Sequence, residues 1–189
     1  PGVVLVSIWN PGAPEASQVE RLNLRSGRRS IVASAPVGQA VFTLDPSGVV
    51  RFARGLDKEN YSELYYRKGE REPWQLVNDS RDSDILAYAL GMAHDGVTAY
   101  VRVTSEDGPD VIEAWNMETL ARTPLLSDPV VDPDAILYDE DGRTPVGARY
   151  MDDGIRLRFF DEDSQMARRH RMLERALPGN GVAITSVTA

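Results

Sequence analysis

The sequence contains no cysteine among its 189 residues, which excludes disulfides and thiolate metal sites. It has only two histidines, His94 and His170. No run of about 18 apolar residues occurs, so no helical membrane span is predicted. Basic residues are outnumbered by acidic ones, 21 to 29, for a net charge of −8. This balance argues against a nucleic-acid or anionic-membrane partner, because such surfaces need clustered positive charge.

Both ends of the sequence have the composition of β-strands. Residues 1–8 lack an initiating Met and a basic segment, so we do not expect them to be a signal peptide. Residues 182–189 are likewise strand-like. We therefore expect the chain to be a piece of a longer protein, whose compartment is left open. The composition, 42% hydrophobic and 26% charged, is that of a globular protein.

Short alternating runs bounded by Gly, Pro and Asp dominate the chain. Three of them follow one another between His94 and Leu126, at residues 97–103, 111–115 and 120–126. Polar turns separate them at residues 106–109 and 116–119. This pattern is typical of antiparallel strands joined by short loops.

The spacing of three turn glycines indicates an internal repeat. Gly48 and Gly96 are 48 residues apart, and Gly96 and Gly142 are 46 apart. A period of this size with about four short strands per unit is typical of β-propeller blades. The regular spacing favours blades over the competing β-sandwich.

We therefore predict an all-β fold, a partial β-propeller of three to four four-stranded antiparallel blades. The predicted blade-like units cover residues 1–39, 40–84, 85–134 and 135–189. Most closed rings need more blades than this. An incomplete ring leaves sheet edges uncovered, so we expect the isolated piece to self-associate.

One helix is predicted near the C-terminus, over residues 164–176. Asp163 or Ser164 can cap its start, and Pro178-Gly179 ends it. The spacing of the apolar residues predicts one buried helical face. That face would consist of Met166, His170, Leu173 and Leu177.

No catalytic residue is predicted in this sequence. Serine hydrolysis usually needs a Gly-x-Ser-x-Gly turn with a histidine base, and no such motif occurs. His94 lies beside Asp95 in a predicted turn, and His170 lies on the apolar side of the predicted helix. Both are interpreted as structural. A glycosidase acid pair could come from distant blades, but nothing identifies one.

No metal or cofactor is predicted either. Carboxylates cluster at residues 132–134, 139–142 and 161–163, yet none of these matches the full calcium loop. The basic cluster Arg168 to Arg171 could bind phosphate, although a solvated or ion-paired helix face explains it as well. Trp9, Trp74 and Trp115 lie in or beside predicted strands and are expected to pack.

The last part of the chain resembles the late blades of the prolyl oligopeptidase family. The resemblance is carried by residues 145–150, 158–161, 176–179 and 182–186. It includes the Val146-Gly147 pair before the predicted helix and the Leu-Pro-Gly turn at 177–179. It is most similar to bacterial acylaminoacyl-peptidase-like and dipeptidyl-peptidase-like members, and it is confined to residues 145–186.

The resemblance implies a parent serine peptidase with an N-terminal propeller and a C-terminal α/β-hydrolase domain. The propeller would restrict access to short or unstructured peptides, so its partners would be that domain and the peptide substrate. The family's catalytic Ser, Asp and His lie in the hydrolase domain and have no counterpart here. The chain alone would not hydrolyse peptides. A propeller interaction module is the alternative, and a propeller lyase or glycosidase is a third reading.

Overall fold

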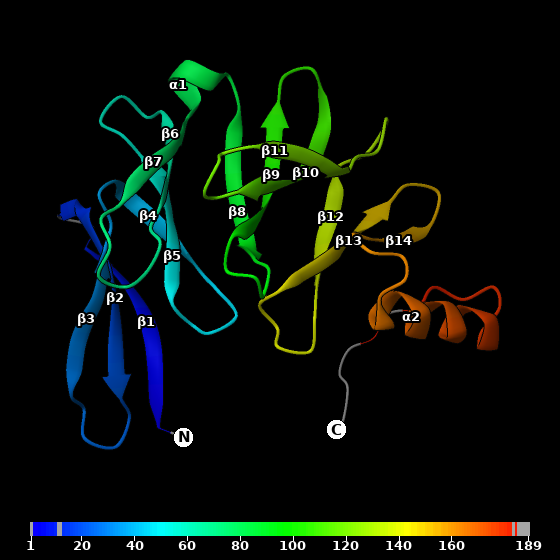
Figure 1. Cartoon of the computed structure of the whole chain (residues 1–189), viewed down its shortest axis with the longest axis horizontal. Helices are drawn as coiled ribbons and strands as arrows, with labels where there is room; N and C mark the ends of the chain where they lie inside the picture. Colours follow the sequence, from blue (N-terminus) through cyan, green and yellow to red (C-terminus); the bar gives the residue numbers. More distant parts are fainter. Residues whose placement is uncertain (1, 11–12, 183, 185–189) are drawn as a thin grey trace. The chain divides into compact units, whose positions relative to one another are not determined.

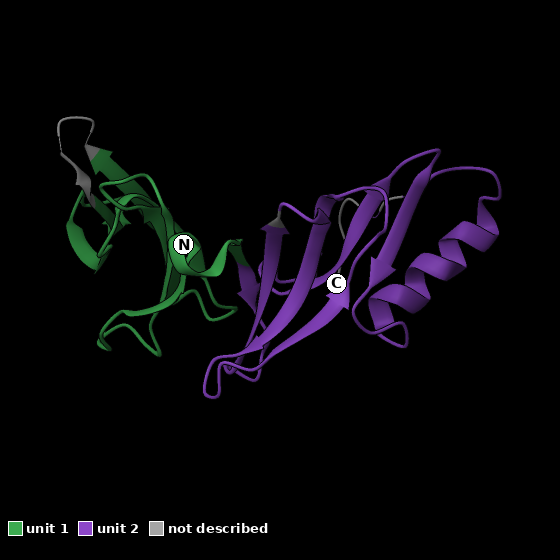
Figure 2. Cartoon of the chain, turned by 90° about the horizontal axis from the view of Figure 1, so that it is seen from above, with its two compact units in different colours: residues 1–89 green, residues 90–189 purple. Residues whose placement is uncertain are grey.

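The computed structural model describes residues 2–10, 13–182 and 184. Within these residues the chain forms β-strands and two helices (Figure 1). It divides into two compact units, residues 1–89 and 90–189 (Figure 2). Among the described residues, neither helix has the length and hydropathy needed to cross a membrane.

The strands form four separate sheets, each made of consecutive antiparallel strands. The first contains β1 (Val3–Asn10), β2 (Ala13–Asn23) and β3 (Arg29–Ser34). The second contains β4 (Gly38–Leu44), β5 (Val50–Leu56), β6 (Ser62–Tyr66) and β7 (Gln75–Asp79). The third contains β8 (Leu86–Met92), β9 (Thr98–Ser105), β10 (Gly108–Asn116) and β11 (Arg122–Leu126). The fourth contains β12 (Pro133–Tyr138), β13 (Pro145–Met151) and β14 (Ile155–Phe159).

The predicted all-β fold class is confirmed, and the series of meander sheets fits a partial propeller. The expected four strands are present in the second and third sheets. The first and fourth sheets have three strands in the described part of the chain. Most of the strand-like run at residues 182–189 lies outside the described residues.

The repeat of turn glycines is a repeat of hairpins. Gly48, Gly96 and Gly142 have φ angles of 86°, 71° and 66°. They lie in the first hairpin of their sheets, between β4 and β5, between β8 and β9, and between β12 and β13. A left-handed φ strains any residue with a Cβ, which explains why glycine recurs at these positions.

A second kind of turn is shared by the β2–β3 and β10–β11 hairpins. The side-chain oxygens of Asn23 and Asn116 each accept two backbone N–H groups at 2.9 and 3.0 Å. Both turns then need one left-handed residue. The first turn has Gly27 there, with a φ of 66°, whereas the second has Leu120, with a φ of 59°. Leu120 is therefore a strained residue.

Replacing Leu120 by glycine is expected to stabilise the protein by up to about 1 kcal/mol, since it relieves the left-handed strain. The urea midpoint should rise with an unchanged m-value. Leu76→Gly is the control, because Leu76 is also exposed but lies in β7 and is not among the residues with positive φ. That variant should lose stability. A lower midpoint for Leu120→Gly would contradict the interpretation.

Each unit has its own apolar core. In the first unit, Val19, Ala33 and Val50 are buried together. In the second unit, the cluster is Ile112, Leu126, Ala148 and Tyr150. These residues come from facing strands of neighbouring sheets within a unit.

The tryptophans only partly follow the expectation that all three pack. Trp115 is buried in the second unit, and Trp74 packs beside the core of the first. Trp9 is 61% exposed, so the expectation was wrong for this residue. The reason is its place at the end of β1, an edge strand whose register breaks between Ile8 and Asn10.

The C-terminal helix is present as α2 (Gln165–Ala176), and α1 (Ser80–Ser83) is a single turn before β8. Ser164 is the N-cap of α2, and its hydroxyl accepts the N–H of Ala167 at 3.2 Å. The buried residues of α2 are Ala167 and His170. Leu173 and Leu177 are 36% and 48% exposed, so the predicted apolar face was wrong in its C-terminal half. Only the first half of α2 covers the sheet, through Met166 and His170.

Candidate functional site

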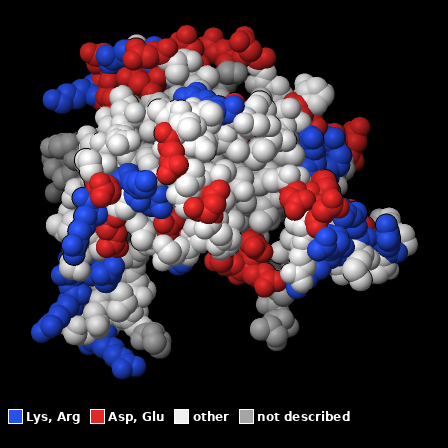
Figure 3. Space-filling view, in the orientation of Figure 1, with Lys and Arg blue, Asp and Glu red and all other residues white. Residues whose placement is uncertain are grey.

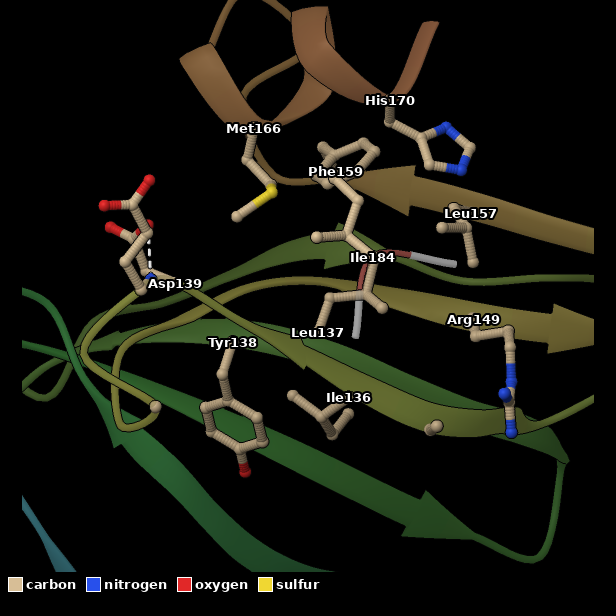
Figure 4. A pocket seen from close by; sticks show the side chains of 13 residues that line it. Ile136, Leu137, Tyr138, Asp139, Arg149, Leu157, Phe159, Met166, His170 and Ile184 are labelled. Atoms are coloured by element: carbon tan, nitrogen blue, oxygen red, sulfur yellow. Dashed lines mark hydrogen bonds between the residues drawn. The ribbon is translucent and has the colours of Figure 1, made fainter. Parts of the chain in front are cut away.

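A pocket of about 400 Å³ lies between the β12–β13–β14 sheet and the first half of α2 (Figure 4). Most of its lining is apolar. The main apolar side chains on the α2 side are Leu137, Leu157, Phe159, Met166 and Ile184. Ile136, beside Leu137 on β12, packs against the core on the other face of the sheet. Pockets of this size and character are where ligands usually bind.

The sheet side of the pocket follows from strand periodicity. Leu157 and Phe159 lie on the pocket face of β14, while Arg156 and Arg158 lie on the opposite face. Gly147 of β13 is paired with Phe159. A Cβ at Gly147 would lie 2.2 Å from the carbonyl oxygen of Arg158. Glycine therefore lets β13 and β14 approach closely beneath the pocket.

The helix side is held in place by His170. Met166 and His170 are four residues apart, so they lie on one face of α2. The His170 ring packs 5.9 Å from the Phe159 ring, centroid to centroid. Its Nε2 lies 3.0 Å from the Val182 carbonyl oxygen, and its Nδ1 lies 3.6 Å from a Glu174 carboxylate oxygen. A carbonyl only accepts, so Nε2 carries the proton, and His170 links α2 to the chain that follows it.

Each polar side chain in the lining already has a partner within the chain. The pairs are Tyr138 with the Leu90 carbonyl, Asp139 with the Glu140 N–H, Glu140 with Arg169, and Arg149 with Asp134. Burial raises the pKa of Tyr138, so its phenol stays a neutral donor. The pocket consequently offers apolar surface to a ligand, and its charged groups are engaged elsewhere.

The second histidine, His94, lies at a different place in the same unit. Its side chain is 66% exposed, and its Nε2 lies 3.3 Å from the Thr144 hydroxyl oxygen and 3.6 Å from Asp141 Oδ2. The sequence placed it beside Asp95 and gave no sign of these partners. The Thr144 hydroxyl donates to Asp141 at 2.6 Å, so its proton is not directed at His94. This arrangement does not form a nucleophile–base pair.

The three carboxylate clusters act as turn and pairing residues. Asp141 accepts the backbone N–H groups of Arg143 and Thr144, both at 2.8 Å. Asp132 accepts the Asp110 N–H at 2.7 Å, and Asp161 accepts the Asp163 N–H at 2.8 Å. Across residues 2–10, 13–182 and 184, no group of three or more potential ligands is placed to hold a metal ion.

The basic cluster of α2 is largely engaged with acidic groups or carbonyls. Arg169 pairs with Glu140, Arg171 pairs with Glu162 at 3.1 Å, and Arg168 donates to the Asp163 carbonyl. These contacts support the ion-paired reading of the cluster over phosphate binding.

Charge is divided unevenly between the two units. Of the 29 acidic and 21 basic residues, 11 of each lie in residues 1–89, which leaves 18 acidic and 10 basic residues in 90–189. The net charge of −8 therefore belongs to the second unit. In the first unit, Figure 3 shows basic side chains gathered at the free end of the β2–β3 hairpin.

The sequence contained some of the signals for this pocket. The sequence predicted the strand that became β14 and the shared helix face of Met166 and His170. It did not identify Ile136, Leu137 or Ile184 as lining residues. No local signal shows that α2 covers that face of the sheet.

Comparison with known proteins gives little to set beside this geometry. No protein-family model matches the sequence, and no curated protein matches it. Among solved structures, the chain is similar to the crystal structure of TolB from Acinetobacter baumannii, with 12% identity and a TM-score of 0.49. The match covers 82% of this chain and 40% of that one. A likeness at this identity and TM-score assigns neither a family nor a function.

Proposed function

We propose that this chain is a non-catalytic binding module of blade-like sheets, which holds an apolar side chain of a peptide or protein partner in the pocket beneath α2. The observation that carries the proposal is the lining of that pocket. Its apolar side chains are open to a ligand, while its polar side chains are already engaged within the chain. Such a site binds without supplying an acid, a base or a nucleophile.

The expected affinity is modest. Burying one leucine-sized side chain contributes about 1.5–3 kcal/mol, which alone is too little for stable binding at micromolar concentrations. The pocket would therefore anchor a partner that also makes contacts outside it. A peptide is a better candidate than a small apolar molecule, because a peptide backbone provides those further contacts.

A leucine-containing peptide tests the proposal. We expect acetyl-Thr-Leu-Glu-Leu-Thr-amide to shift the amide signals of pocket residues in the ¹⁵N-labelled chain. Leu137→Asp should weaken binding at least tenfold, because the ligand would have to bury a charge. Leu76→Asp is the matched control, since Leu76 is a 47% exposed leucine on β7 in the other unit. Equal weakening by both variants, with far-UV circular dichroism unchanged, would refute the pocket as the binding site.

A narrower proposal rests on the residues that resemble the prolyl oligopeptidase family. Val146 and Gly147 lie in β13, and α2 follows β14, which is the order that the resemblance requires. In that case the module caps an α/β-hydrolase domain and restricts peptide access to it. The gene tests this: a Gly-x-Ser-x-Gly motif encoded downstream of residue 189 would support it. Further blades up to a stop codon would refute it, as would peptidase turnover by this chain that a serine-directed reagent blocks.

A further inference from the structure

The outer edge of β14 occupies the position where two other sheets carry a fourth strand. In the two sheets whose first hairpins contain Gly48 and Gly96, the third strands are β6 and β10. Each of them pairs with a following fourth strand, β7 or β11. In the sheet whose first hairpin contains Gly142, the third strand is β14. In the described part of the chain, no strand pairs with its outer edge.

The backbone of β14 shows which groups point outward. The Phe160 N–H donates to the Val146 carbonyl at 2.9 Å, so Phe160 and Val146 form a hydrogen-bonded pair. Such pairs alternate along an antiparallel ladder. The backbone N–H and C=O groups of Arg158 and Arg156 therefore point toward β13. The backbone N–H and C=O groups of Leu157 and Ile155 point to the outer edge. At the far end, the Phe159 N–H is taken by Glu162 at 3.3 Å, which limits the open edge to residues 155–157.

The side chains beside this edge define what an added strand would contain. Leu157 lines the pocket, and the 50% exposed Ile155 precedes it on the same face. On the opposite face, Arg156 Nη2 bonds Asp128 at 3.0 Å and Asp152 at 2.6 Å, and its side chain stays 46% exposed. A guanidinium has five donors and both of these bonds use Nη2, so the Nε and Nη1 groups of Arg156 retain capacity for a further carboxylate.

We propose that β14 receives an extended segment of a partner protein as a fourth antiparallel strand. Alternate apolar side chains of that segment enter the pocket, and an acidic residue between them faces Arg156. This proposal rests on the proposed binding function and gives its mode. Main-chain hydrogen bonds to Ile155 and Leu157 supply the contacts that the pocket alone lacks, while the pocket selects the apolar residues.

The test separates the backbone contribution from that of the side chains. The probe is again acetyl-Thr-Leu-Glu-Leu-Thr-amide, and its control has N-methylleucine in place of the second leucine. This control keeps both leucine side chains and the glutamate but removes an N–H that points to β14. We expect the N-methylated peptide to bind at least tenfold more weakly. Ile155→Pro should weaken the parent peptide similarly, because it removes an outward N–H and no bond to β13. The parent peptide should also slow hydrogen exchange at Ile155 and Leu157.

The outcomes are distinguishable. If the N-methylated peptide binds as tightly as its parent while Leu137→Asp still abolishes binding, strand addition is wrong and the pocket function stands. If neither peptide shifts the pocket signals, both proposals fail. A variant that ends at Ile184 identifies a competing occupant. Should Ile155 and Leu157 be protected from exchange in the full chain and lose protection in this variant, the chain's own end fills the edge, and a partner strand is ruled out.

Discussion

Replacing Arg51 by methionine is expected to lower the free energy of unfolding by about 3–5 kcal/mol, because it leaves the buried carboxylate of Asp45 without its cation. Arg51 Nη1 lies 3.0 Å from Asp45 Oδ2, and both side chains are more than nine-tenths buried. The same guanidinium donates to the Tyr66 hydroxyl at 2.7 Å and to the Arg67 carbonyl at 2.9 Å. All of these partners are lost together.

The loss should be measured by urea denaturation followed by circular dichroism, with Glu70→Gln as control. The Arg21–Glu70 pair spans 3.5 Å, and both side chains are about half exposed, at 51% and 46%. Solvent and salt screen such a pair, so the control should cost less than about 1 kcal/mol. The double variant Asp45→Asn/Arg51→Met should be less destabilised than Arg51→Met alone. Similar losses of unfolding free energy in Arg51→Met and Glu70→Gln would show that the buried ion pair stabilises the fold no more than the exposed one.

The same pair makes a prediction about acid. Burial by itself raises the pKa of Asp45, but hydrogen bonds from Ser47, the Val49 N–H and Arg51 outweigh it and hold the pKa below the usual value of 3.8. A carboxylate with a lowered pKa stabilises the fold above its unfolded pKa, and this contribution is lost as pH falls through the folded value. Stability should therefore decline as the pH falls below about 4, and Asp45→Asn should flatten that decline.

Alanine at Gly147 is expected to cost about 3 kcal/mol or more, at the upper end for overpacking. Its Cβ would lie 2.2 Å from the Arg158 carbonyl oxygen and 3.0 Å from the Phe159 Cα. Both are backbone atoms, so a rotamer change cannot relieve the clash. β13 and β14 would have to separate, and the floor of the pocket under Phe159 would open. Peptide binding should fall along with stability.

Gly154→Ala is a matched control in the loop that joins the same two strands. No heavy atom lies within 4 Å of a Cβ built at Gly154, and its φ lies outside the left-handed region. We expect a change of less than about 1 kcal/mol there, with either sign. A urea midpoint for Gly147→Ala within error of the Gly154→Ala midpoint would show that the two strands can yield.

Some features of the fold were predictable because they depend on a few neighbouring residues. The turn glycines at 48, 96 and 142 were readable because a left-handed φ selects glycine locally. The start of α2 was readable because Ser164 supplies its own cap. The strands were readable because a two-residue period is written directly in the sequence.

Burial and pairing depended on the tertiary structure. Trp9 is exposed and Trp115 is buried, although both are strand tryptophans. His94 lies next to Asp95 in sequence, but its contacts are with Asp141 and Thr144 in the turn between β12 and β13. Leu173 and Leu177 continue the apolar spacing of α2, yet the covered part of the helix ends before them.

The sequence by itself determined the all-β class, the spacing of the hairpins and the position of the C-terminal helix. The tertiary structure decided which face of the last sheet α2 covers and hence where the pocket lies. The physical reason is range. Turn and cap preferences arise from hydrogen bonds and sterics within a few residues, whereas the pocket joins β12 to α2 and Ile184 across almost 50 residues of chain. No local sequence pattern predicts that the apolar faces of the last sheet and of α2 pack together.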